Sequence, residues 1–98
     1  MEIIKNINGN KLDLSLTGRL DTTTAPELDE VLKESLEGVS ELVIDMDKLE
    51  YISSAGLRSL LVAQKTMNKN GIMKIKNVND MIMEVFKVTG FADIMNIE

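Results

Sequence analysis

An unbroken apolar run, followed by a helical pattern and a second strand pattern, constrains this fold most. The run is Leu42, Val43 and Ile44, which lie within "ELVIDM", residues 41–46. Such a run is typical of a central strand that is covered on both faces. A helix of roughly residues 55–68 and a short strand, residues 72–76, follow it. A strand–helix–strand unit is a right-handed crossover, so the two strands are predicted to be parallel.

Two more strands precede this unit and form a hairpin. Residues 2–7 make a short strand pattern, and Asn8 and Gly9 then tolerate the positive φ of a hairpin turn. From Lys11 onward apolar and polar residues alternate, which indicates one buried and one solvent-facing side. The apolar positions are Leu12, Leu14 and Leu16. Because the hairpin is antiparallel, the whole sheet is predicted to be mixed.

Between the hairpin and the apolar run the hydrophobic spacing changes to that of a helix. Thr24 and Glu27 match the T-x-x-E capping box at its start. Pro26 falls in the first turn, where its missing N–H costs nothing. Gly38 is suited to the C-terminal end. A helix is therefore predicted between these boundaries.

A third helix is predicted near the C-terminus. Asn79 or Asp80 caps its start, Gly90 ends it, and residues 91–98 are expected to return to the core. The element order is thus β-β-α-β-α-β-α. At 98 residues the chain is large enough for one modest core. We expect a single α/β domain, residues 1–98, built as a sandwich with a mixed four- to five-stranded β-sheet flanked by α-helices.

Composition argues against several classes of partner. The net charge is −5 and the basic residues are scattered, which disfavours nucleic acid and anionic membranes. With only two Phe and one Tyr, the chain lacks a stacking platform for single-stranded nucleic acid. No apolar run approaches a membrane span and no signal peptide is visible. With no cysteine, a cytoplasmic location is expected.

The absence of histidine and cysteine argues against catalysis. A Ser-His-Asp triad, a cysteine nucleophile and a typical zinc site all require these residues. No Walker A, G-x-G-x-x-G or G-x-S-x-G motif occurs. Asp21, Asp45 and Asp47 fit a magnesium cluster or ordinary loop acids, and we interpret them as loop acids. No enzyme activity, metal or cofactor is expected; a small nucleotide-binding enzyme using Asp21 and Asp45 is the alternative.

The serine pair Ser53 and Ser54 follows the strand and begins the next helix. In open α/β sheets binding sites lie along this edge. A helix N-terminus also favours a negative group such as a phosphate. The simpler interpretation is that a serine hydroxyl caps the helix, which contributes about 1 kcal/mol. Local pattern alone leaves both interpretations open.

Three stretches of the chain, in order, resemble a known family. They are "GRLDTTTAPEL", "LVIDMDKLEYISSAGLRSL" and "VTGFADIM". Together they resemble the STAS domain, in particular the small stand-alone bacterial anti-sigma factor antagonists. The similarity covers nearly the whole chain and implies a STAS-like sandwich.

The resemblance also implies a mode of action. Antagonists of this family bind an anti-sigma factor that is also a serine kinase, and so free a sigma factor for transcription. The kinase then phosphorylates a serine at the start of the signature helix, which releases the antagonist, and a PP2C-type phosphatase resets it. The matching position here is Ser54. Ser53 stands where the family often has Asp, which makes it a second candidate acceptor, and Ala55 stands where a second serine is frequent.

The partner-binding surface implied by the resemblance comes from two segments. Its residues are Asp21, Thr22, Thr23, Ser53, Ser54, Ala55, Gly56, Leu57 and Arg58. The alternative within the same family is a docking or scaffold module of a transporter or signalling assembly that is never phosphorylated.

Overall fold

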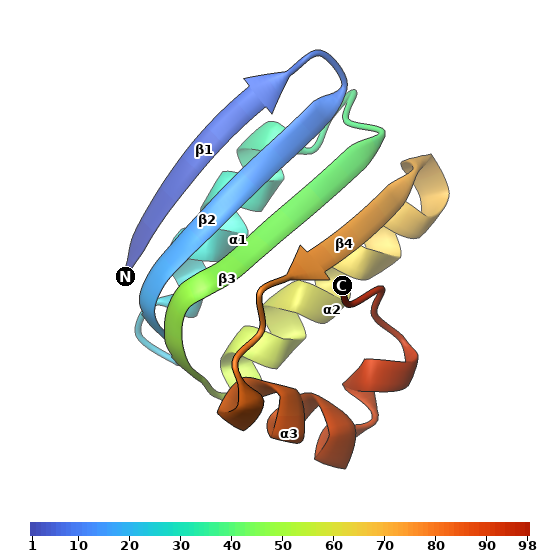
Figure 1. Ribbon diagram of the computed structural model, residues 1–98. Helices are drawn as coiled ribbons and strands as arrows, with labels where there is room; N and C mark the ends of the chain where they lie inside the picture. The colour runs from blue at the N-terminus through green and yellow to red at the C-terminus, as the bar shows by residue number, and fades with distance from the viewer.

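The computed structural model describes residues 1–98 and contains the predicted order of elements (Figure 1). The strands are β1 (Glu2–Asn8), β2 (Lys11–Leu20), β3 (Glu41–Ile52) and β4 (Ile72–Lys76). The helices are α1 (Ala25–Ser35), α2 (Ser54–Asn70) and α3 (Asp80–Thr89), with a short 3₁₀ turn, η1 (Phe91–Asp93), after α3.

The four strands form one mixed sheet in the order β1-β2-β3-β4. β1 is antiparallel to β2, whereas β2, β3 and β4 are parallel. The C-terminal tail returns to the free edge of β4, where Ile75 and Ile97 form a single parallel bridge. Two backbone hydrogen bonds of 2.9 and 2.8 Å hold this bridge. The prediction of a mixed sheet with a packed tail is therefore confirmed.

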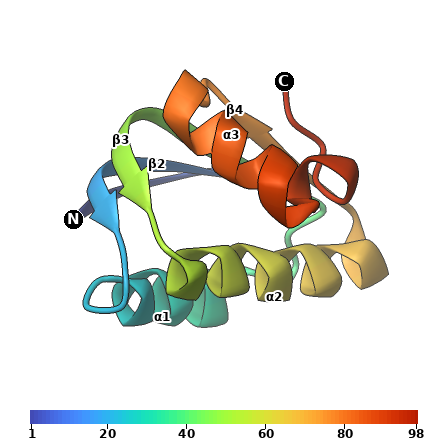
Figure 2. The same cartoon turned by 90° about the horizontal axis from the view of Figure 1, so that it is seen from below.

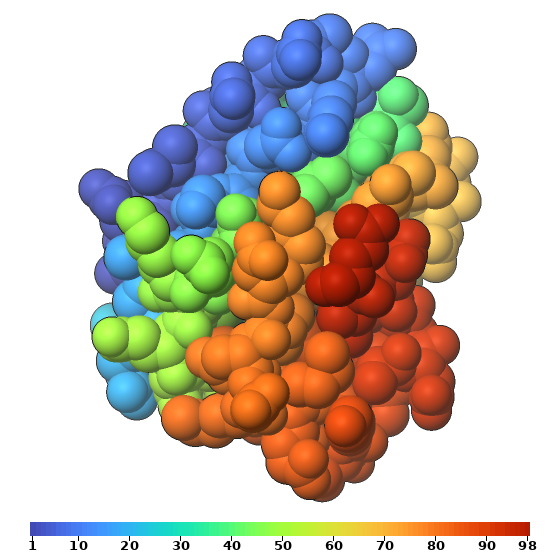
Figure 3. Space-filling view, in the orientation of Figure 1, coloured from blue at the N-terminus to red at the C-terminus, as the bar shows by residue number.

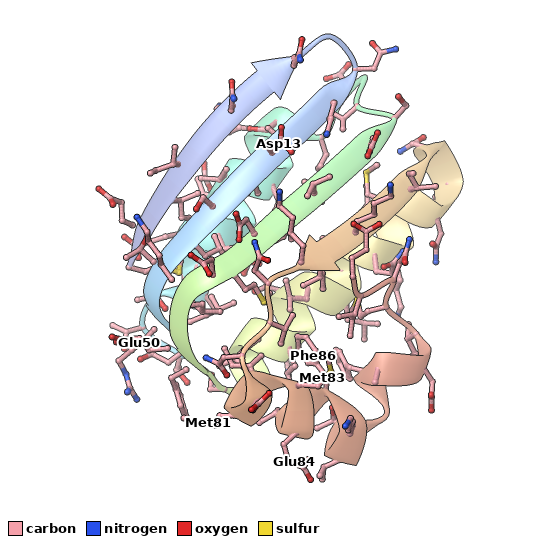
Figure 4. All side chains as sticks on the ribbon, viewed as in Figure 1. Asp13, Glu50, Met81, Met83, Glu84 and Phe86 are labelled. Carbon is pink, nitrogen blue, oxygen red and sulfur yellow. The ribbon has the colours of Figure 1, made fainter.

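α1 and α2 cover one face of the sheet and enclose the core (Figure 2). Leu12, Leu14 and Leu16 are fully buried on that side, as their alternation predicts. α3 lies at the end of the sheet and contributes Ile82 and Phe86 to the same core. In Figure 4, Phe86 points into the molecule and Glu84 away from it.

The apolar run is buried as predicted, but α1 and α2 cover only the face of the sheet that carries Leu42 and Ile44. Val43 is buried but lies outside the core, in a shallow hollow of about 300 Å³ on the other face, beside Asp13 and Asp45. Figure 4 shows Asp13 on this face, and Figure 3 shows blue and green strand residues at its surface. The cross-strand partners of Val43 are Asp13 on β2 and Lys74 on β4, so its neighbours on this face are polar side chains.

β3 is longer than predicted and reaches Ile52. Its register with β2 shifts twice, and at each shift β3 has one residue more than β2. These β-bulges bend the strand. Because of the bulges, Met46, Leu49 and Ile52 are all buried although they are three positions apart in the sequence. A regular strand buries every second residue. The spacing of three therefore indicates a loop in the sequence, although the chain forms a strand as far as Ile52.

The helix ends agree with the sequence in most places. Asn79 caps α3 by accepting a 2.8 Å hydrogen bond from the N–H of Ile82, and Gly90 ends the helix with φ of 83°. Gly71 follows the last residue of α2. α1 ends at Ser35, three residues before Gly38.

Candidate functional site

The carboxyl ends of β2 and β3 lie side by side and lead into α1 and α2. The N–H of Ser53 donates a hydrogen bond to the carbonyl oxygen of Leu20 at 2.9 Å, and this bond joins the two segments. In Figure 2 both helices begin at the same end of the molecule. The two segments of the predicted contact surface, residues 21–23 and 53–58, are therefore neighbours.

A tight turn at Asp21 connects β2 to α1. Its Oδ1 accepts hydrogen bonds from the N–H groups of Thr23 and Thr24, at 3.0 and 3.2 Å. Its own N–H donates to the hydroxyl of Thr24 at 2.9 Å, and that hydroxyl donates to the carbonyl of Arg19 at 2.8 Å. Thr22 and Thr23 are left exposed at the tip of this internally bonded turn.

The capping box predicted from Thr24 and Glu27 is not formed. Thr24 occupies the N-cap position of α1, but its side chain makes no capping hydrogen bond. Its backbone is helical, with φ of −100° and ψ of −21°, whereas a capping residue is normally extended. The turn at Asp21 uses the hydroxyl of Thr24 instead, so the prediction is wrong for a local geometric reason.

Asp21 is held ionised by this turn. Desolvation raises the pKa of Asp21, but hydrogen bonds from the N–H groups of Thr24 and Thr23 and the nearby Arg19 outweigh it and lower the pKa below its usual range. The guanidinium of Arg19 lies 3.7 Å from Asp21 and stacks 4.3 Å from the centre of the Tyr51 ring. A negative charge therefore lies beside the start of α2, and the adjacent cation is already paired.

The two serines lie in different environments. Ser53 is the N-cap residue of α2, yet its hydroxyl makes no capping bond. Its Oγ is buried and has no hydrogen-bond partner. Ser54 is the first residue of the helix and its side chain is exposed. A capping hydroxyl therefore does not account for the serine pair. Ser53 is half-buried with a buried hydroxyl, whereas Ser54 is exposed.

The remaining predicted contact residues divide between surface and core. Arg58 is exposed and Ala55 is half-buried, but Gly56 and Leu57 are buried. A Cβ at Gly56 would lie 2.7 Å from Cγ of Leu20, so glycine lets α2 begin close to the sheet.

Gly56 and Leu57 thus support the site from within, and the prediction that they belong to the contact surface is corrected. The other predicted residues, called the Ser54 surface below, are Asp21, Thr22, Thr23, Ser54, Ala55 and Arg58. Ser53 is half-buried and is left out because its hydroxyl is buried.

Comparison with known proteins identifies the family. The sequence profile of the STAS domain matches residues 2–98, which is nearly the entire chain. The chain belongs to the STAS domain family.

Several relatives of this STAS domain are named as anti-sigma factor antagonists. The anti-sigma-B factor antagonist of Staphylococcus aureus (strain NCTC 8325 / PS 47) is 31% identical over 87 residues, which are 87% of this chain and 81% of the relative. Among solved structures, an anti-sigma factor antagonist from Mycobacterium paratuberculosis matches with a TM-score of 0.89 at 20% identity, over 98% of this chain and 83% of that chain.

A further solved relative is the Bacillus cell fate determinant SpoIIAA in its phosphorylated form. It matches with a TM-score of 0.78 at 15% identity, over 99% of this chain and 91% of that chain. Both structural matches confirm the predicted STAS-like fold.

A groove between α1 and α2 extends from the Ser54 surface of this STAS domain. Its volume is about 680 Å³. Thr22, Ala55 and Arg58 belong to both the groove and the Ser54 surface. Apolar side chains that line it further along include Leu32, Leu36 and Val62. The sequence analysis missed this groove, because a hollow between two helices depends on their separation over the sheet.

The three aspartates considered as a magnesium cluster are not brought together. Asp45 pairs with Ser15 in the middle of the sheet, whereas Asp21 follows the last residue of β2. The carboxylate of Asp45 accepts hydrogen bonds from the side chain of Asn77 at 3.0 Å and from the N–H of Asp47 at 2.9 Å. No group of three acidic side chains in this STAS domain is arranged to hold a metal ion. None of its helices is long and apolar enough to span a bilayer.

Proposed function

We propose that this chain is an anti-sigma factor antagonist that acts by exchanging partners and catalyses no reaction itself. Unmodified, it binds an anti-sigma factor that is also a serine kinase, and a sigma factor is released. The observation that carries the proposal is the match to an anti-sigma-B factor antagonist over 81% of that relative's length. These partners work in the cytoplasm, and we place the protein there.

Phosphorylation of Ser54 ends the interaction in this proposal. The kinase transfers the γ-phosphoryl group of ATP to Oγ of Ser54, the bond to ADP breaks, and the hydroxyl proton is lost to solvent. A PP2C-type phosphatase later hydrolyses the ester. The exposed position of Ser54, in contrast to the buried hydroxyl of Ser53, supports this choice of acceptor. The structure of phosphorylated SpoIIAA supports a phosphorylation cycle in a relative of the same fold.

Charge is sufficient to explain release. A phosphoserine adds about −1.5 to −2 charges at neutral pH to a surface that already carries the ionised Asp21. Like charges brought together at an interface cost several kcal/mol, and a shift of about 1.4 kcal/mol is already tenfold in affinity. A refolding of the domain is not required.

Three variants test this proposal against the anti-sigma factor kinase of the same organism. Ser54→Ala is expected to bind the kinase normally and to resist ATP-dependent release, whereas Ser54→Asp is expected to bind more weakly. Ser53→Ala is the matched control and should still be released by ATP. Binding is measured by calorimetry and phosphate by intact mass. If Ser54→Asp binds as tightly as the wild type, the charge mechanism is wrong.

Peptide mapping of protein from growing and stressed cells supplies the second test. Occupancy of Ser54 that changes with condition is expected. Serines that stay unmodified in every condition would favour the docking or scaffold module without a phosphorylation cycle.

A further inference from the structure

Arg58 is a cation without an ion-pair partner beside the proposed acceptor. The ion pairs of the structure involve Lys11, Arg19 and Lys74, and Arg58 takes part in none of them. Its side chain is exposed and contributes to the groove between α1 and α2. Arg58 is also the only cation on the Ser54 surface. Its charge is therefore free to meet an incoming anion.

Ser54 and Arg58 are four residues apart on the same helix. Side chains at this separation are neighbours on the helix surface, with about 5–6 Å between their Cβ atoms. Helical side chains point back toward the N-terminus, so that of Arg58 extends over the turn that contains Ser54. An acid four residues before a base is also the favourable order of charges. A phosphoryl group on Ser54 would therefore lie within reach of the guanidinium.

The other nearby arginine is already engaged. Arg19 lies 3.7 Å from the carboxylate of Asp21 and stacks on the ring of Tyr51. Moving it to a phosphate would break both interactions and leave Asp21 without its cation. Arg58 has no such contacts to lose, which makes it the favoured partner.

We infer that Arg58 is the phosphate-binding residue of the modified protein and pairs with the phosphoryl oxygens of Ser54. This inference rests on the proposal that Ser54 is the acceptor. Guanidinium groups bind phosphate with two parallel hydrogen bonds, which are stronger than those between neutral groups. The pair also engages a cation of the groove that a carboxylate of the partner could otherwise use, and leaves Lys33 of α1 as the other basic side chain that lines the groove. Phosphorylation thus acts by withdrawing a positive contact as well as by adding a negative one.

The test uses protein that carries phosphoserine at position 54, installed during synthesis by codon suppression. The second pKa of the phosphate, ordinarily about 6, is followed by ³¹P NMR. In the Arg58→Met variant this pKa is expected to rise by roughly several tenths of a unit, because a close cation stabilises the dianion. Arg19→Met is the matched control and should change it much less. An unchanged pKa in Arg58→Met, or a larger change in Arg19→Met, would overturn the assignment.

A thermal-unfolding cycle gives an independent readout. Phosphorylation should raise the melting temperature more in the wild type than in Arg58→Met, and equal increments would count against the pair. Because the phosphate is installed without a kinase, both measurements test Arg58 whether or not a kinase modifies Ser54 in the cell. Failure of the proposed function would appear separately, as absent kinase binding or an unmodified Ser54.

Discussion

The N–H of Ser53 donates to the carbonyl oxygen of Leu20 at 2.9 Å and joins the ends of two parallel strands. Leu20 also packs beneath the start of α2, within 3.0 Å of where a Cβ on Gly56 would lie. One residue thus supports the serine loop through its backbone and the helix through its side chain. Asp21 comes directly after it, which is why the turn of threonines and the exposed Ser54 form one surface.

This arrangement predicts that Gly56→Val destabilises the domain. The new side chain would overlap Cγ of Leu20 and Cγ1 of Ile52, at 2.7 and 2.9 Å from its Cβ. Overpacking of this kind costs about 1–3 kcal/mol, which urea unfolding would measure. Lys65→Val introduces the same residue at an exposed site on α2 and should change the stability by less than about 0.5 kcal/mol. Equal stability of the two variants would contradict the close approach of helix and sheet.

A second prediction concerns the turn before α1. Asp21→Ala removes the acceptor of the N–H groups of Thr23 and Thr24. Their amide hydrogen exchange is expected to accelerate by roughly tenfold. The N–H of Thr23 then loses its acceptor, and that of Thr24 keeps only the carbonyl of Asp21 at 3.2 Å. Asp29→Ala, an exposed change on α1, is the control and should leave both amides protected as before. Unchanged exchange in Asp21→Ala would mean that the turn is held by other contacts.

The cap of α3 gives a third prediction. The side chain of Asn79 accepts a hydrogen bond from the N–H of Ile82 and donates one to the carbonyl of Leu49 at 3.1 Å. Asn79→Ala loses both and is expected to lower the unfolding free energy by about 1–2 kcal/mol. Asn79→Asp keeps the cap acceptor and loses only the donor, so it should fall between the two in a denaturant titration. A loss in Asn79→Asp as large as that in Asn79→Ala would assign the stability to the Leu49 contact alone.

Acid should weaken the contribution of Asp45. Desolvation raises its pKa, but hydrogen bonds from Asn77 and Asp47 outweigh this and lower it from 3.8. As the pH falls, Asp45 of the unfolded chain therefore takes up a proton before Asp45 of the folded chain does. The stabilisation by ionised Asp45 is complete above about pH 4, and it is lost as the pH falls through the lower pKa of the folded state. The difference in unfolding free energy between wild type and Asp45→Asn is therefore expected to shrink from pH 7 to about pH 3. A difference that is constant with pH would contradict an ionised native Asp45.

Much of the fold follows from local pattern. The alternation of Leu12, Leu14 and Leu16 specifies a half-buried strand, and the crossover from residues 41 to 76 specifies parallel neighbours. The cap at Asn79 and the end at Gly90 are also local, because each depends on residues within one helical turn. The choice of Ser54 as the candidate phosphorylation site rests on the resemblance of "ISSAGL" to the family pattern.

Tertiary structure decided what the pattern left open. The bulges of β3 arise from its pairing with β2, and they put Leu49 and Ile52 in the core at a spacing that does not resemble a strand. Packing against Leu20 buries Gly56, while the helix start exposes Ser54 and covers the hydroxyl of Ser53. Sequence periodicity reports which side of an element is apolar. Exposure of a single hydroxyl depends on atoms that are distant in the chain, and only the packed fold brings those atoms together.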